Sequence, residues 1–223
     1  MRGTRPIRSA PLAADQVLAM RSLCFDRFFL AAHDRGARVA HRLTLDHPDA
    51  VERLALLDIA PTLDMYEGTD LGFAISYYHW FLLIQPGGLP ERLLGAEPEF
   101  FLRHKLGSTG GGGTDPAIFT AAAMAEYIRC FSDPATIHAT CEEYRAGASI
   151  DLEHDRATLD EKMKAPLLVL WGARGTIERC FDPLTLWRAR ASAVQGEALP
   201  CGHYLAEELP VETAARLERF FTA

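Results

Sequence analysis

Apolar runs of strand length alternate with helix-length segments near both ends of this sequence, and this alternation limits the fold more than any other feature. Residues 27–32 and 51–59 are two such runs. Between them lies a helical pattern over residues 37–46, which is closed by His47 and Pro48. Another helical pattern, over residues 11–23, precedes the first run. Continuous apolar strands joined by helices are typical of a parallel sheet covered on both faces, so we predict an α/β fold.

The alternation returns in the last third of the chain but is missing from the middle. In the last third we expect a strand, a helix, a short strand and a helix, at residues 167–171, 183–193, 197–199 and 210–221. The middle is dominated by aromatic-rich helical segments instead. We therefore predict an N-terminal part of the core with the candidate nucleophile, a helical lid, and a C-terminal part of the core with the candidate catalytic histidine, at residues 1–63, 64–155 and 156–223.

Composition excludes several classes of function. Hydrophobic residues make up 48% of the 223 residues, which is ordinary for a globular protein. The net charge of −7, with both signs scattered along the chain, argues against a nucleic-acid-binding surface. No apolar run approaches the roughly 20 residues of a membrane span. The five cysteines form no CxxC pair, so we expect reduced thiols in a cytoplasmic protein.

The first apolar run ends in a five-residue pattern that is typical of a nucleophile elbow. Such an elbow reads small-x-nucleophile-x-Gly, and residues 32–36 read Ala-His-Asp-Arg-Gly. Asp34 therefore stands where ester hydrolases carry serine. In isolation an aspartate here is more often a turn or capping residue, but the strand before it and the helix after it favour a nucleophile. A carboxylate nucleophile attacks an sp3 carbon and forms an ester, which water then hydrolyses.

Hydrolysis of such an ester requires a base and an acid that orients it. His203 follows the last short strand in a Gly-His turn, where this type of fold places its histidine; on its own it could equally be a surface residue. Asp58 closes the apolar run at residues 51–59, and a charge in that position needs a partner. We therefore predict Asp58 as the orienting acid, with Asp182 as the alternative.

Several segments taken together resemble the fluoroacetate/haloacetate dehalogenases, which are α/β-hydrolases. The resemblance extends from about residue 13 onward and is carried by residues 33–38, 57–62, 78–81, 141–147, 151–155 and 202–208. It implies an α/β-hydrolase fold with a helical lid, and hydrolytic cleavage of the carbon–halogen bond of fluoroacetate or related 2-haloacids. It also implies a homodimer. No cluster in the sequence has metal-ligand spacing, and the reaction requires neither a metal nor an organic cofactor.

The resemblance implies a role for each matching residue. Asp34 would be the nucleophile, His203 the base and Asp58 its acid. Two arginines would bind the substrate carboxylate with their planar guanidinium forks, namely Arg35 and Arg38. Three donors of N–H or O–H hydrogen bonds would cradle the leaving halide, namely His79, Trp80 and Tyr144. Without the resemblance, we would place Trp80 in the apolar core of the lid.

The family pattern also contains strands that this sequence lacks. It implies about four strands before the elbow, roughly a hundred residues at typical element lengths, with a His-Gly loop that supplies an oxyanion-type N–H. Only 33 residues precede Asp34, and they hold no His-Gly pair. We therefore expect a fold without its N-terminal strands, in which the strand at residues 27–32 becomes an exposed apolar edge.

Two rival hypotheses stay open. An epoxide hydrolase uses the same nucleophile and base but needs two lid tyrosines as donors to the epoxide oxygen. The tyrosines available for this are Tyr77, Tyr78, Tyr127 and Tyr144. The other rival is an inactive truncated remnant that acts at most as a binding partner. The two arginines and the His79-Trp80 pair favour a small anionic haloacid over an epoxide.

Overall fold

A parallel sheet of four strands forms the centre of the computed structural model, which describes residues 7–107 and 115–223. The strands are β1 (Phe28–His33), β2 (Val51–Leu57), β3 (Leu167–Gly172) and β4 (Val194–Leu199). They lie side by side in the order β1-β2-β3-β4, and all three pairings are parallel. The predicted α/β class is therefore confirmed.

Helices cover both faces of the sheet because successive strand residues point to opposite sides. On one face, Leu54, Leu56 and Val169 pack in the larger core cluster together with the first two helices and a helix that lies between β3 and β4 in the chain. On the other face, Leu57 and Leu170 pack against the C-terminal helices. The helices of the two faces are α1 (Ser9–Ser22), α2 (Asp34–Asp46) and α12 (Pro183–Arg190) on one side, and α13 (Leu205–Glu208) and α14 (Pro210–Thr222) on the other.

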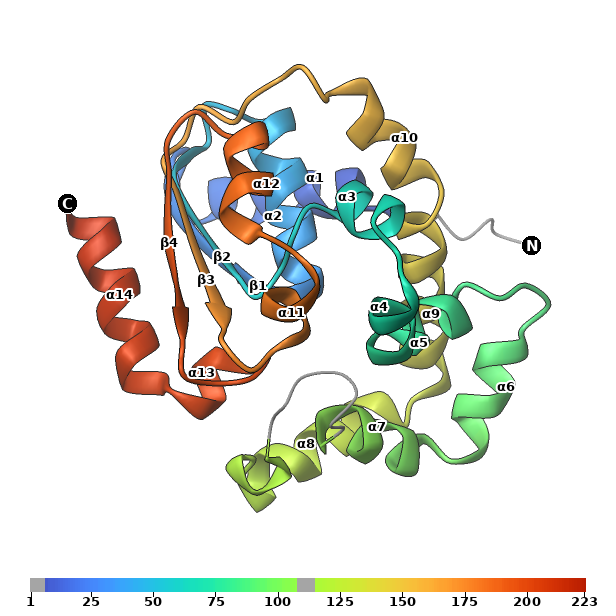
Figure 1. Ribbon diagram of the computed structural model, residues 1–223. Coiled ribbons are helices and arrows are strands. Elements are labelled where there is room, and N and C mark those ends of the chain that lie inside the picture. The colour runs from blue at the N-terminus through green and yellow to red at the C-terminus, as the bar shows by residue number, and fades with distance from the viewer. Residues whose placement is uncertain (1–6, 108–114) are drawn as a thin grey trace.

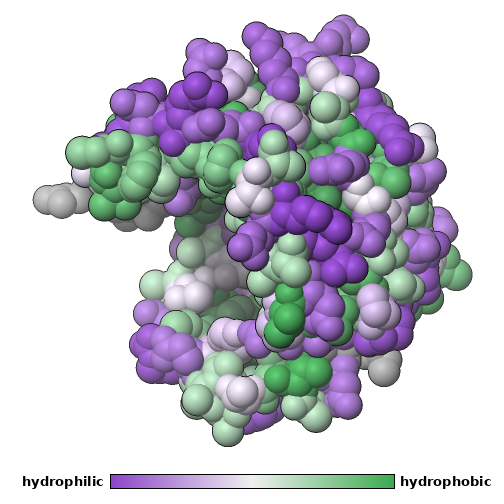
Figure 2. All heavy atoms as spheres, turned by 90° about the vertical axis from the view of Figure 1, so that its left-hand side faces the viewer, coloured by the Kyte–Doolittle hydropathy of each residue, from purple (hydrophilic) through white to green (hydrophobic). Residues whose placement is uncertain are grey.

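The segment between β2 and β3 contains helices and no strand in its described part. Its elements are α3 (Thr62–Glu67), α4 (Leu71–Ser76), α5 (Tyr78–Leu83), α6 (Leu89–Ala96), α7 (Pro98–Gly107), the 3-10 helix η1 (Pro116–Ile118), α8 (Ala121–Phe131), α9 (Pro134–Gly147) and α10 (Ile150–Ala157). Helices α6 to α8 lie away from the sheet, and α9 and α10 lead back toward it (Figure 1). We call this segment the lid. One side of the molecule is deeply hollowed, and polar and apolar residues are mixed around the hollow (Figure 2).

Three element boundaries differ from the sequence prediction by three residues, and one of them is the end of α12, which lies at Arg190 instead of residue 193. The elbow helix begins at Asp34 rather than at residue 37, so the nucleophile candidate is itself the first helical residue. Strand β4 begins at Val194, three residues earlier than expected, because Gln195-Gly196-Glu197 gives no apolar signal. Gly196 is required there by close packing, since a Cβ at this position would lie 2.2 Å from the carbonyl oxygen of Val169.

Strand β1 has one strand neighbour among the described residues, which is β2. Its side chains are more exposed than those of β3, every residue of which is buried. Phe29 is 49% exposed and stacks on Phe221 of α14, with the ring centroids 5.2 Å apart. This is the apolar edge expected from the sequence. No helix in the described part of the chain is long and apolar enough to cross a membrane.

Candidate active site

The predicted elbow is a sharp junction between β1 and α2. Asp34 follows the strand directly, and its φ of 45° lies in the left-handed region. A non-glycine residue in this region is strained, on the order of 1–3 kcal/mol, and persists only where the surrounding structure holds it. The Asp34 side chain lines a cavity of about 260 Å³ that also contacts lid residues. The turn therefore presents a carboxylate to a cavity, as a nucleophile requires.

His203, in the loop between β4 and α13, lies between two carboxylates. Its Nδ1 is 2.6 Å from Oδ2 of Asp58, and its Nε2 is 3.7 Å from Oδ2 of Asp34. Asp58 follows β2 and is 1% exposed, and its Oδ1 accepts a hydrogen bond of 2.9 Å from the backbone amide of Gly172. The buried charge of Asp58 thus has the partners that its burial demands.

The alternative acid, Asp182, lies elsewhere. It caps the N-terminus of α12, where it accepts hydrogen bonds from the amide and the hydroxyl of Thr185. Glu178, another carboxylate after β3, accepts a hydrogen bond from the indole N–H of Trp171. Of these three carboxylates, Asp58 is the one that contacts His203.

The electrostatics of this group favour an anionic Asp34. Burial alone would lower the pKa of His203, but the carboxylates of Asp34 and Asp58 outweigh burial and raise this pKa to about 10. Burial alone would raise the pKa of Asp34, but His203, together with His33 and Arg38, holds it well below its usual value. Near neutral pH the resting site therefore contains a carboxylate at Asp34 and an imidazolium at His203.

His33 contacts both the backbone and the ring of His203, and the sequence analysis did not predict this role. Its Nε2 donates a hydrogen bond of 2.9 Å to the backbone carbonyl of His203, and the two rings lie 4.5 Å apart. Burial, and then the charge of His203, lower the pKa of His33 to about 4, so His33 is neutral at pH 7. Its position directly before the nucleophile candidate could have indicated from the sequence that His33 lies beside the site.

Arg35 and Arg38 form hydrogen bonds with neighbouring protein groups and do not line the cavity in this structure. Arg38 is 5% exposed, donates a hydrogen bond of 2.9 Å to Oγ1 of Thr62, and lies 4.6 Å above the ring of Trp80. Arg35 donates to the backbone carbonyl of Glu143 at 2.9 Å, and its Nε lies 3.2 Å from the carboxylate of the same residue. The expected contact of both guanidinium groups with the cavity is therefore not seen.

The three predicted halide ligands come together in the lid. His79 and Tyr144 line the cavity, with ring centroids 5.8 Å apart, and Trp80 lies 6.3 Å from Tyr144. Trp80 itself does not line the cavity, and within residues 7–107 and 115–223 its buried indole N–H has no hydrogen-bond partner. An unsatisfied buried donor costs about 1–3 kcal/mol. Burial, and then Asp34, raise the pKa of Tyr144, so its phenol keeps the proton that it would donate.

Lys105 in the last turn of α7 is a further cavity residue that the sequence analysis missed. Its Nζ lies 2.9 Å from Nδ1 of His79.

A second, more apolar cavity of about 480 Å³ adjoins the first. The two share the residues Leu102, Leu106, Phe131 and Tyr204.

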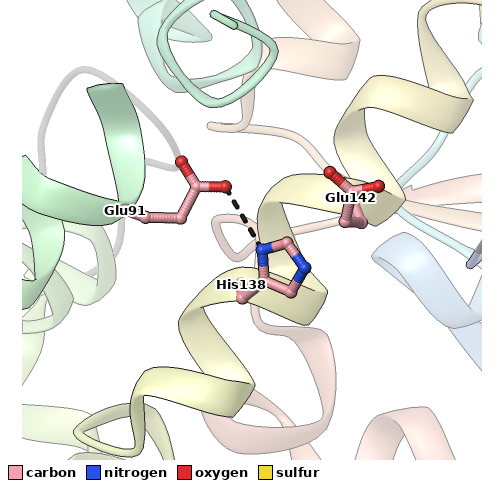
Figure 3. Close-up of side chains that lie close together, drawn as sticks. All are labelled: Glu91, His138 and Glu142. Carbon is pink, nitrogen blue, oxygen red and sulfur yellow. Dashed lines mark ion pairs between the residues drawn. The ribbon is translucent and has the colours of Figure 1, made fainter. Parts of the chain in front are cut away.

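A separate group in the lid has the donor types of a metal site. One ligand atom each from Glu91, His138 and Glu142 lies within 4.8 Å of the others (Figure 3). The guanidinium of Arg145, however, donates to the Glu91 and Glu142 carboxylates at 2.6 and 2.7 Å. Because a cation already neutralises both carboxylates, we interpret the group as an ion-pair network that joins α6 to α9.

The comparisons with known proteins agree with this fold. No protein-family model matches the chain. Over 214 residues the chain is 41% identical to a fluoroacetate dehalogenase from Burkholderia sp, covering 95% of this chain and 69% of that protein. It is 30% identical over 213 residues to a soluble epoxide hydrolase from Corynebacterium sp. (strain C12), covering 92% of this chain and 71% of that protein.

A solved structure resembles the chain over nearly its whole length. It is that of an alpha/beta hydrolase candidate from Nostoc sp PCC 7120, and the two share 55% sequence identity with a TM-score of 0.93. The match covers 96% of this chain and 73% of the Nostoc chain.

Proposed function

This chain belongs to the α/β-hydrolases related to fluoroacetate dehalogenase, and from that premise we propose that it hydrolyses the carbon–halogen bond of a small 2-haloacid through an ester of Asp34. The observation that carries the proposal is the position of His203, with Asp34 at 3.7 Å and Asp58 at 2.6 Å. A nucleophilic carboxylate, a base and an orienting acid are thereby grouped at one elbow.

In the first step, an Asp34 carboxylate oxygen attacks the carbon that carries the halogen. A carbon–oxygen bond forms, the carbon–halogen bond breaks, and the halide leaves with the bonding electrons. The low pKa of Asp34 keeps this carboxylate anionic. Fluoride is a poor leaving group, so donors that meet its developing charge lower the barrier. The unpartnered indole N–H of Trp80, with His79 and Tyr144 beside it, supports this role.

In the second step, His203 activates a water molecule that attacks the carbonyl carbon of the ester. Forming the ester removes the negative charge of Asp34, which is one of the two charges that raise the pKa of His203. The pKa of His203 therefore falls, its resting proton passes to solvent, and a neutral base is available for the water. His203 takes a proton from the water and later returns it to the departing alkoxide, which leaves as the 2-hydroxyacid. Asp58 holds the imidazolium in place.

We propose that Arg35 and Arg38 bind the substrate carboxylate once substrate is present. Arg35 would have to leave the carboxylate of Glu143, which it now contacts at 3.2 Å. The substrate carboxylate would replace that partner with a similar charge. This exchange explains how a buried cation can be neutralised both with and without substrate.

The test of the proposal is release of fluoride from fluoroacetate by this chain, measured with a fluoride electrode, together with formation of glycolate. A His203→Asn variant should accumulate the substrate adduct on the peptide that contains Asp34, which mass spectrometry would detect. Fluoride release without an adduct in the variant would argue against an aspartyl ester. Absence of both products in a folded wild-type chain would reject the proposed activity.

Epoxide hydrolysis is the second candidate, and two observations favour it. Tyr77 and Tyr144 both line the cavity, so two phenol donors are available for an epoxide oxygen. The adjoining apolar cavity of about 480 Å³ would accept a hydrocarbon substituent that a haloacetate lacks. Diol formation from styrene oxide, assayed beside fluoride release, separates the two activities.

A further inference from the structure

We infer that Lys105 is a positioning residue for halide release, which holds His79 in the tautomer that offers its Nε2–H as a donor. This inference rests on the proposed function, because it names the group that prepares one of the proposed halide donors. It adds a lysine from α7 to a set that otherwise comes from α5 and α9.

The direction of one hydrogen bond carries the inference. Nζ of Lys105 lies 2.9 Å from Nδ1 of His79, and both residues line the cavity that Asp34 also lines. An ammonium group has three donors and no acceptor, so Nδ1 must accept. A neutral imidazole carries one proton, which then resides on Nε2. The lysine thus decides which ring nitrogen of His79 can donate.

The charges around this pair keep the two groups in the required states. Burial, and then the charge of Lys105, hold the pKa of His79 well below its usual value, so the ring is neutral. Burial lowers the pKa of Lys105 to about 8, and Asp34 offsets part of that shift. Lys105 is therefore mostly protonated at pH 7. A cation bonded to Nδ1 also polarises the ring, which strengthens Nε2–H as a donor.

The surroundings of Lys105 argue against a merely structural lysine. Within residues 7–107 and 115–223, no carboxylate lies at ion-pair distance from its ammonium group; its other close neighbour is the ring of Tyr78, with Nζ 5.5 Å from the centroid. A largely buried charge without an opposite charge beside it is unfavourable. Such a charge in a cavity with perturbed titratable groups is typical of a functional site.

The halogen of the substrate provides the activity test. Lys105→Met should lower kcat for fluoroacetate roughly tenfold to a hundredfold, an effect comparable with losing one donor to a developing charge. The same variant should change kcat for bromoacetate much less, because bromide leaves with little help from hydrogen bonds. Lys105→Arg keeps a cationic donor and should recover most of the fluoroacetate rate. The matched control is Lys164→Met, an exposed lysine outside the cavity, which should behave as wild type.

The tautomer of His79 provides a test that does not depend on activity. Ring 15N shifts of the folded protein should show Nε2 protonated in the wild type and a mixture of tautomers in Lys105→Met, with His79→Asn identifying the signal. An unchanged tautomer in a folded Lys105→Met variant would overturn the inference. Equal losses for both halogens with a raised KM would also overturn it, because they would mark Lys105 as a direct carboxylate ligand. If the wild type released no halide, the proposed function would fail while the shifts still decided the role of Lys105.

Discussion

The two walls of the cavity differ in how their polar groups are satisfied. On the sheet side, Asp58 and His203 meet at 2.6 Å, and a backbone amide holds the other carboxylate oxygen. On the lid side, the ring centroids of His79 and Tyr144 are 5.8 Å apart, and next to the cavity the indole N–H of Trp80 has no hydrogen-bond partner among the described residues. On the sheet side, His203 and both oxygens of Asp58 have protein partners without a ligand, whereas on the lid side one hydrogen-bond donor has none among the described residues. We propose that the strand ends hold the reacting groups and that the lid provides the groups that bind the substrate and its leaving halide.

The largest expected effect tests the sheet side at the nucleophile. Asp34→Asn should remove activity by roughly 10⁴-fold or more, since the amide cannot form the ester. Asparagine tolerates the left-handed conformation of this residue, so backbone strain should not change, but stability at neutral pH should fall because the His203 charge loses one of its two partners. Steady-state fluoride release and thermal unfolding measure the two properties, and exposed Asp49→Asn is the control. Substantial activity in an Asp34→Asn protein whose sequence has been verified would show that another residue is the nucleophile.

The acid of the sheet side should give the next largest loss. Asp58→Asn should lower turnover by roughly 10²- to 10⁴-fold, because the imidazole loses the group that orients and stabilises it. Asp182→Asn should leave turnover unchanged and stability nearly unchanged, since the amide oxygen of asparagine can still cap α12. If Asp182→Asn impaired turnover as strongly as Asp58→Asn, the assignment of the acid would be wrong.

The charge pairing on the sheet side should also appear in the pH dependence of stability. The pKa of His203 is raised from 6.5 to about 10 in the folded chain, so its stabilising contribution is full below pH 6.5 and is lost as pH rises through 10. The unfolding free energy, measured with urea from pH 6.5 to 8, below the range in which the lowered pKa of Lys105 acts in the opposite direction, should therefore fall with rising pH. In Asp58→Asn this fall should be smaller, because one of the two carboxylates that raise the pKa is gone. An equal slope in both proteins would contradict the pairing.

The smallest expected effect separates the lid side from ordinary packing. Trp80→Phe should slow fluoroacetate turnover roughly tenfold relative to bromoacetate, with little loss of stability from broken hydrogen bonds, because its N–H has no partner in the part of the chain that the structure describes. The matched variant is Trp187→Phe, whose indole donates at 3.0 Å to the carbonyl of Ile59. It should lose about 1 kcal/mol of stability and show no halogen preference. Identical behaviour of the two variants would remove the distinction between the walls.

The sequence predicted the sheet side better than the lid side, for a physical reason. Asp34 and Asp58 each close an apolar strand, and neighbouring parallel strands bring their carboxyl ends together, so proximity follows from the pattern. Lys105 and His79 come from different lid helices, and no periodicity in either helix indicates the approach of the other. The rotamers of Arg35 and Arg38 likewise depend on local partners such as Glu143 and Thr62, which spacing alone does not reveal.

The sheet order has a consequence for how the chain acquires its structure. β1 and β2 are joined by a single helix, but the pairing of β2 with β3 brings together strands that the whole lid separates along the chain. Closing so long a loop is entropically costly and slow, whereas the β1-α2-β2 unit is local. We expect this unit to form early, before β3 pairs with it. Until β3 pairs, the edge of β2 that will bind β3 can pair with other chains, so the refolding yield should decrease as protein concentration increases.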